Sequence, residues 1–492
     1  MLFNSYVFLF LFLPVVLTTY FSLNKIKKYD LAKVTLILFS FMFYGYMNPS
    51  YVLILLASVI INYLSSSLLD RCAENTQRRR IIGFCAVTFN IGLLFYFKYY
   101  DFFIQNINIA FRQDFALKHI ALPLGISFFT FQQISFIVDR IKGKAKHYKW
   151  IDYALFVSYF PQLIAGPIVR HDHMIPQFCD EAKKSFNSES FLKGIRIFSV
   201  GLAKKVLLAD ELAKVVNVGY SDVNLLDTPS ALVTMLFYTF QILLDFSGYC
   251  DMAMGIGTMM NFDLPANFDR PYLSASVKEF WNRWHMTLNS FFTEYVYFPL
   301  GGSRRGRAAT LRNIMIVFLL SGIWHGANWT FILWGVLNGL FICMENLLPY
   351  EKINKRIRQG ITFAITNLAL VLFRSPSIGT AFTLYKKLFS FRFTGRMRNL
   401  LYSLSGFKNK ALEKILEKTL GTAMGDTPVL IMFMLYALFV LTASIYCGTL
   451  HNTKKWVEDH KATNVNMVIF ALIVGLCVIS LSQVTVFLYF NF

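Results

Sequence analysis

Residues 6–23 read YVFLFLFLPVVLTTYFSL, an uncharged stretch long enough to cross the hydrocarbon core of a bilayer, which is about 30 Å thick. No basic segment precedes it and no A-x-A cleavage site follows, so we expect a membrane anchor rather than a cleaved signal peptide. Across all 492 residues, 55% are hydrophobic and only 15% are charged. Soluble domains carry about 25% charged residues. The sequence therefore predicts an all-α polytopic membrane protein.

Further spanning helices are predicted along the chain. The candidate ranges are 32–47, 51–68, 81–99, 122–138, 230–246, 311–341, 361–373, 428–446 and 465–490. The range 311–341 is long enough for two short passes. We see no internal repeat and no linker that would separate a second domain, so we expect a single membrane domain over residues 1–492.

Three segments differ from simple spans. Residues 152–169 are apolar but are interrupted by two prolines and a glycine, which predicts a re-entrant or kinked element enclosed by protein. Residues 188–212 and 277–302 alternate apolar stretches with basic or aromatic residues. That pattern is typical of amphipathic helices lying at a headgroup boundary.

Basic residues gather in the short loops between the predicted spans. The formal net charge is +20, and the basic loops 24–30, 70–80 and 139–149 follow the first, third and fifth spans. Loops rich in Lys and Arg stay in the cytoplasm, so we expect the N-terminus outside and these loops inside. The positive charge therefore does not indicate nucleic-acid binding, whereas membrane lipid and an anionic substrate are expected partners.

One histidine lies deep in a long apolar stretch. It is His325, in the segment SGIWHGANW at residues 321–329. An imidazole at membrane depth needs a hydrogen-bond partner or a water-filled space. Asn328 is placed to hold one ring nitrogen, while Gly322 and Gly326 allow close backbone approach or leave room for a ligand. The segment predicts either a functional site or a histidine bonded to a neighbouring helix.

A second histidine, His285, lies in the segment FWNRWHMTLNSFF. It follows Asn282, Arg283 and Trp284 in a region dense in aromatic side chains. An aromatic belt with a basic residue is the simpler interpretation of this segment. Together with His325, however, it supplies two imidazoles suited to general acid and base chemistry on a hydroxyl group.

Three more polar side chains interrupt an apolar stretch. Gln241, Asp245 and Asp251 lie in YTFQILLDFSGYCDMAMG, residues 238–255. We expect them to face a protein interior or a cavity, because polar groups exposed to lipid are costly. Packing and participation in a site are both open interpretations for them.

The sequence lacks the motifs of several other kinds of site. The seven cysteines form no C-x-x-C pair, which argues against a disulfide framework and a metal site. Neither G-x-S-x-G nor H-E-x-x-H occurs. GGSRRGR, residues 301–307, is not a P-loop, but its cations can receive the phosphates of a nucleotide-bearing donor or simply mark a cytoplasmic loop.

Two long motifs resemble the membrane-bound O-acyltransferase (MBOAT) superfamily. They are FWNRWHMTLNSFFTEYVYFPLGGSRRG, residues 280–306, and SGIWHGANWTFILWG, residues 321–335. FPQLIAGPIVR, PLGISFFTFQQISFIVD and YTFQILLDFSGYCDMAMG narrow the resemblance to the alginate, peptidoglycan and polysaccharide O-acetyltransferases. The motif-bearing core then covers about 120–345, followed by C-terminal helices at about 361–490.

The resemblance implies a fold, a reaction and partners. The fold is a ring of tilted helices around a central funnel and tunnel, in the inner membrane of a bacterial cell. The donor is cytoplasmic acetyl-CoA, used as a substrate with no cofactor, and the acetyl group passes to a cell-surface glycan directly or through an extracytoplasmic acetyltransferase partner. His325 is the catalytic histidine and His285 the second family histidine. The candidate substrate or tunnel residues are Trp324, Asn328, Trp284, Arg283, Asn282, Asp245, Gln241 and Asp251.

Two alternatives remain open from the sequence. A sister branch of the same superfamily transfers D-alanine to teichoic acid and shares both histidine motifs. A polytopic transporter or flippase of a lipid-linked sugar would also place polar groups and a broken helix at membrane depth, although such transporters often consist of two repeated halves.

Overall fold

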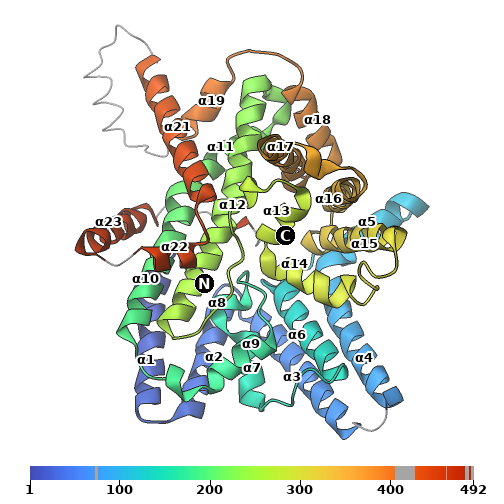
Figure 1. Cartoon of the computed structure of the whole chain (residues 1–492), viewed down its shortest axis with the longest axis vertical. Helices are drawn as coiled ribbons and strands as arrows, with labels where there is room; N and C mark the ends of the chain where they lie inside the picture. The colour runs from blue at the N-terminus through green and yellow to red at the C-terminus, as the bar shows by residue number, and fades with distance from the viewer. Residues whose placement is uncertain (73–75, 405–426, 461–462, 482–486, 489–492) are drawn as a thin grey trace.

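The computed structural model describes residues 1–72, 76–404, 427–460, 463–481 and 487–488 (Figure 1). The described residues are mainly helical and contain no β-strand, only an isolated bridge between Phe268 and Trp284. The all-α architecture predicted from the sequence is thereby confirmed.

The helices follow one another with short connections. The first group is α1 (Leu13–Lys25), α2 (Tyr29–Gly45), α3 (Ser50–Arg71), α4 (Thr76–Leu94), α5 (Tyr100–Phe111) and α6 (Ile126–Ile141). The central group is α7 (Trp150–Ser158), α8 (Phe160–Leu163), α9 (His171–Cys179), α10 (Ser188–Ala203), α11 (Asp210–Ser221), α12 (Thr228–Met259), α13 (Val277–Arg283) and α14 (Met286–Phe292). The last group is α15 (Arg307–His325), α16 (Trp329–Leu347), α17 (Lys355–Arg374), α18 (Ile378–Leu388), α19 (Met397–Tyr402), α21 (Thr427–Thr449), α22 (Thr453–Asp459) and α23 (Asn464–Ser480).

Seven helices in the described part of the chain are long and apolar enough to cross a membrane. They are Phe8–Lys25, Ser50–Arg71, Thr76–Phe111, Thr228–Met259, Arg307–His325, Trp329–Leu347 and Ile431–Thr449. All seven overlap predicted spans, and the division of 311–341 into two passes is confirmed. The predictions at 32–47 and 122–138 correspond to shorter helices, because α2 and α6 have 17 and 16 residues.

The two remaining predicted spans, 361–373 and 465–490, fall on helices that are not among these seven. Residues 361–373 belong to α17, which starts with the basic residues Lys355 and Arg356 and reaches 20 residues only by including them. Residues 465–490 begin in α23, which has 17 residues, and part of that range lies outside the described residues.

The central helix α12 is the scaffold for the rest of the chain. It begins after Asp227, whose side chain and that of Ser230 form a capping box, and it extends for 32 residues. The pair α10 and α11 runs beside it (Figure 1). A Cβ added to Gly201 would lie 2.6 Å from the carbonyl oxygen of Gly248, so only glycine permits this approach of the two backbones.

The two segments predicted as interfacial helices pack against other helices of the fold. Residues 188–212 cover α10 and the start of α11, and α10 packs against α12 through Gly194 and Gly201. Residues 277–302 form α13 and α14 with a break between them, and Trp281 is buried there. Arg196 in the first segment donates to the backbone carbonyl of His460, and the position of both segments relative to the lipid headgroups stays a prediction.

The broken element predicted at 152–169 is confirmed. α7 ends at Ser158, and α8 is a single turn from Phe160 to Leu163. Both helices are buried, which satisfies the requirement that irregular backbone at membrane depth be enclosed by protein.

Candidate active site

His285 lies at the break between α13 and α14. Its φ of 46° and ψ of 52° place it in the left-handed region, which is unfavourable for a residue with a Cβ. The N–H of Met286 donates to the backbone carbonyl of Asn267 at 3.0 Å and helps to hold this conformation. The break places His285 inside the protein, where only 1% of its surface is exposed.

The side chain of Asn267 determines which ring nitrogen of His285 carries the proton. Asn267 Oδ1 accepts a hydrogen bond from the backbone N–H of Thr287 at 3.1 Å, and an N–H can only donate, so this atom must be the oxygen. Nδ1 of His285 lies 3.3 Å from the same oxygen and therefore bears the hydrogen, which leaves the lone pair on Nε2. Burial lowers the pKa of His285 to about 3, so the ring is neutral.

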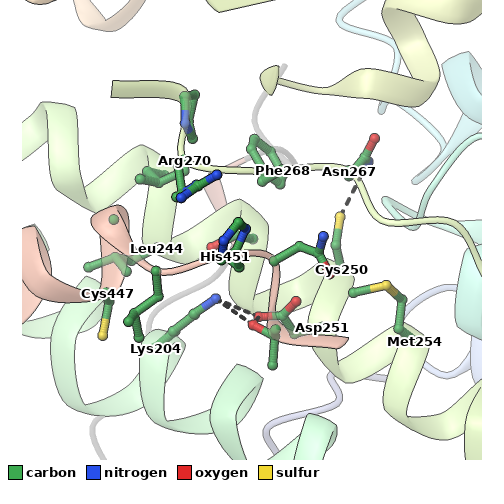
Figure 2. Close-up of a pocket in the computed structure, with 17 residues that line it drawn as sticks. Lys204, Leu244, Cys250, Asp251, Met254, Asn267, Phe268, Arg270, Cys447 and His451 are labelled. Carbon is green, nitrogen blue, oxygen red and sulfur yellow. Dashed lines mark hydrogen bonds and ion pairs between the residues drawn. The ribbon is translucent and has the colours of Figure 1, made fainter. Parts of the chain in front are cut away.

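Sequence reasoning did not identify Asn267 as a site residue. Its other amide atom, Nδ2, donates to Cys250 Sγ at 3.4 Å, as Figure 2 shows. Asn267 lies in the loop after α12, 18 residues before His285. No local pattern marks an asparagine whose partner is that far along the chain.

His325 is the last residue of α15 and lies among aromatic rings. The ring centroids of Trp324, Trp334 and Phe373 lie 4.9, 5.0 and 5.1 Å from the imidazole centroid. Only 2% of His325 is exposed. These neighbours pack against the imidazole and exclude bulk water from most of its surface.

Lys98 holds the end of the helix that carries His325. Its Nζ donates to the backbone carbonyls of Trp324 at 2.5 Å and His325 at 3.1 Å, and it lies 3.4 Å from Ser127 Oγ. A cation at a helix C-terminus stabilises the exposed carbonyl groups. Lys98 belongs to a π-helical segment, Phe95–Tyr99, a conformation that often occurs at functional sites. The sequence analysis did not single it out.

The structure brings both predicted histidines together around one residue. The indole of Trp324 contacts the imidazole of His285, with centroids 6.2 Å apart, and also that of His325 at 4.9 Å. Phe128 contacts the same indole at 5.6 Å. Three of the residues proposed from the sequence, His285, Trp324 and His325, therefore form one buried cluster.

The residues beside His325 differ from expectation. Asn328 does not hold the imidazole, because its Nδ2 donates to the carbonyl of Pro376 and its Oδ1 caps the N–H of Thr330. Gly322 does not line a cavity: a Cβ there would lie 2.5 Å from a backbone oxygen of α16. Gly326 alone meets the expectation, since it lines a cavity next to His325.

The polar residues of α12 lie in buried networks. Asp245 pairs with Lys205 at 2.6 Å, and Asp251 pairs with Lys204 at 2.7 Å. Figure 2 shows Lys204 and Asp251 at a cavity of about 30 Å³ that Asn267 also lines. Asn267 thus links this cavity with His285. Gln241 is buried in the same helix.

Three residues near His285 in sequence have other roles. Arg283 pairs with Glu279 at 2.7 Å one helical turn earlier. Trp284 is buried and its ring stacks with that of Phe280 at 5.4 Å. Asn282 is exposed. These contacts stabilise α13 and do not place the three side chains with Trp324 and His325.

Two cavities flank the histidine cluster. The first, of about 270 Å³, includes in its lining Arg170, Met286, Thr287, Glu294 and Tyr295. The second, of about 340 Å³, includes Tyr96, Lys98, Tyr100, Asp101, Gly326, Ala327 and Asn328. The first therefore adjoins the residues that follow His285, and the second adjoins those that follow His325.

Helix α6 connects the surroundings of both histidines. Ser127 near its start lines a small cavity of about 20 Å³ together with His325, and Ser135 lines the first large cavity. Eight residues of helix correspond to about 12 Å along its axis. His325 therefore lines the small cavity near the start of α6, whereas the first large cavity is reached further along the same helix.

Comparison with known proteins identifies the family. A family model described as MBOAT, membrane-bound O-acyltransferase, matches residues 126–349. The peptidoglycan O-acetyltransferase of Helicobacter pylori is 36% identical over 100% of this chain and 98% of its own length. The chain belongs to the membrane-bound O-acyltransferase family. This MBOAT protein is therefore an O-acyltransferase, as the motifs predicted.

Other MBOAT relatives differ in how much of the chain they match. The probable alginate O-acetylase AlgI of Pseudomonas aeruginosa is 37% identical over 80% of this chain and 75% of its own length. The teichoic acid D-alanyltransferase of Bacillus subtilis is 26% identical over 48% of this chain and 61% of its own length. The MBOAT match at 126–349 contains His285, His325 and Asn267, whereas Lys98 lies before it.

Proposed function

We propose that this MBOAT protein moves an acetyl group from cytoplasmic acetyl-CoA to a cell-surface polysaccharide, directly or through an extracytoplasmic partner. The observation that carries this proposal is the buried pair of His285 and His325, which share contact with Trp324 and adjoin separate cavities. Relatives named for O-acetylation match most or all of the chain, which favours acetyl as the transferred group.

The first large cavity is suited to the donor. Its lining residues Tyr295 and Glu294 contact Asp139 and Lys144 of the basic loop 139–149, which the positive-inside rule assigns to the cytoplasm, with the N-terminus outside. Arg170 in its lining contacts Glu294 and lies 3.2 Å from Asp139, so the wall of the cavity is fixed by ion pairs. His285 directly precedes Met286 and Thr287 of this lining, and the lone pair on its Nε2 can accept a hydrogen bond from an amide N–H of the donor.

The second large cavity is suited to the acceptor. Tyr96 and Tyr100 offer aromatic faces, while Asp101 and Asn328 offer polar groups for sugar hydroxyls. His325 at this side takes the proton from an acceptor hydroxyl. The oxygen then attacks the thioester carbon, the C–S bond breaks, and the CoA thiolate receives the proton back from His325.

The test is the chemical state of surface polymers in cells that depend on this chain for their modification. Mass spectra of the surface polymers are compared between cells with the wild type, with His325→Ala and with the control His460→Ala, which changes an exposed histidine. General base catalysis contributes about 10²–10⁴ in rate, so His325→Ala should abolish most acetylation while the control retains it. Wild-type acetylation in His325→Ala would refute the proposal.

The same measurement separates the alternatives. A D-alanyl mass in place of an acetyl mass would assign the chain to the reaction named for its teichoic acid relatives. Export of a glycan without thioester consumption in vesicles would indicate transport instead. Loading labelled acetyl-CoA on the cytoplasmic face only, and recovering label on the opposite face, tests the direction of transfer.

A further inference from the structure

The indole N–H of Trp324 is a buried donor without an acceptor. Only 5% of Trp324 is exposed, and no atom in the described part of the chain accepts a hydrogen bond from its Nε1. A buried polar group normally has a partner, and one that lacks it calls for an explanation, of which a catalytic role is one. Trp281, by contrast, donates from its Nε1 to Asn338 Oδ1 at 3.2 Å.

The position of Trp324 matches the place where an acyl group must react. Its ring contacts both imidazoles, and it lines the cavity of about 20 Å³ that His325 and Phe128 also line. A cavity of this size accommodates one oxygen-sized group. Lys98 bonds the Trp324 carbonyl and lies 5.7 Å from the centre of its ring, so the indole is held rigidly.

Two side-chain amides close to the histidines already have acceptors. Asn328 Nδ2 donates to Pro376, and Asn267 Nδ2 donates to Cys250. We infer that the indole N–H of Trp324 is the hydrogen-bond donor that stabilises the oxyanion during acyl transfer. The inference rests on the proposed function and adds a catalytic residue to it.

The transfer is an addition to the carbonyl group followed by loss of the thiolate. The acceptor oxygen attacks the thioester carbonyl carbon while His325 takes the hydroxyl proton. The carbonyl π electrons move onto the oxygen, which becomes an oxyanion bonded by the Trp324 N–H. When the carbonyl re-forms, the C–S bond breaks and the leaving thiolate takes the proton from the His325 imidazolium. Fixed donors aimed at developing charge contribute strongly to such reactions.

The sharpest test replaces only the N–H. Trp324 is exchanged for 3-benzothienylalanine, in which sulfur replaces the indole N–H with little change of shape, and kcat and the KM for acetyl-CoA are measured in proteoliposomes. Loss of one oxyanion donor lowers kcat by about 10²–10³-fold, so we expect that loss with a nearly unchanged KM. Wild-type kcat in this variant would overturn the inference.

The same exchange at Trp281 is the matched control. It removes an indole N–H that already has an acceptor within the protein, Asn338 Oδ1, so kcat should stay near the wild-type value. If the change at Trp324 impairs folding, Trp324→Phe with a thermal melt and acetyl-CoA binding provides a second variant. A Trp324→Phe protein that folds, binds donor and retains wild-type kcat would also overturn the inference.

Failure of the proposed function gives a different result. If the wild-type chain transfers D-alanyl rather than acetyl groups, the acetyl assignment is refuted. The role of Trp324 can still be tested, because the loss of kcat is then measured with the D-alanyl thioester. A wild-type chain that consumes no thioester at all refutes both, and one that acetylates with equal kcat after the exchange refutes only the role of Trp324.

Discussion

Asn267 Oδ1 lies 3.3 Å from Nδ1 of His285 and also accepts hydrogen bonds from the backbone N–H and the hydroxyl of Thr287. This one oxygen joins the loop after α12 to the start of α14. It therefore determines both the position of the His285 ring and the nitrogen that bears its proton. The arrangement makes Asn267 a positioning residue.

Replacing Asn267 with leucine should lower the catalytic efficiency with acetyl-CoA. Asn267→Leu removes the acceptor for Nδ1–H of His285. The imidazole then populates both tautomers, and in one of them Nε2 carries the proton and has no free lone pair. We expect kcat/KM for acetyl-CoA to fall about 10-fold, equivalent to about 1.4 kcal/mol. Steady-state kinetics with purified protein measures this, and unchanged kcat/KM in a folded variant would show that Asn267 does not position the ring.

Asn267→Asp should make the KM for acetyl-CoA depend on pH. A carboxylate next to Nδ1–H stabilises the imidazolium, so the pKa of His285 rises from its wild-type value of about 3. As the pH falls through the raised pKa, Nε2 becomes protonated and loses its lone pair. The KM for acetyl-CoA should therefore rise at lower pH in the variant. The wild type, whose His285 is neutral between about pH 6 and 8, should not show this rise. Parallel KM profiles would contradict the assignment.

Lys98→Met should reduce turnover. The variant keeps the length of the side chain but removes the hydrogen bonds to the carbonyls of Trp324 and His325. A displacement of about 1 Å at a catalytic group can cost about 100-fold, so we expect kcat to fall by up to that factor. Lys193→Met is the control, since Lys193 pairs with Glu458 far from the histidines in sequence and contact. Equal kcat for the two variants would exclude a positioning role for Lys98.

Gly201→Ala should destabilise the fold. The added Cβ would lie 2.6 Å from the carbonyl oxygen of Gly248, so α10 must move away from α12. Overpacking of this kind costs about 1–3 kcal/mol. Gly360→Ala in α17 is the matched control, because a Cβ there meets nothing within 4 Å. Thermal unfolding in detergent should show a lower midpoint for Gly201→Ala only, and equal midpoints would refute the close contact.

The sequence by itself determined the helical membrane architecture and the identity of both histidines. Hydrophobic stretches are local, so the spans at 6–23 and 51–68 and the two passes within 311–341 could be located without knowledge of the fold. His325 was identified as a candidate site residue because it lies within an apolar stretch, where an imidazole needs a polar environment.

Only the tertiary structure decided what surrounds these histidines. Lys98 reaches the carbonyl of Trp324 across 226 residues of sequence, and Gly201 meets Gly248 across two helices. Asn328 was expected to hold His325 because it is close in sequence, yet its side chain bonds Pro376 and Thr330. A side chain forms hydrogen bonds with groups that are close to it in space. Groups that are distant in sequence become close only when the helices that carry them pack together. Local patterns therefore reveal which groups need a partner, and the packed fold determines which partner each one finds.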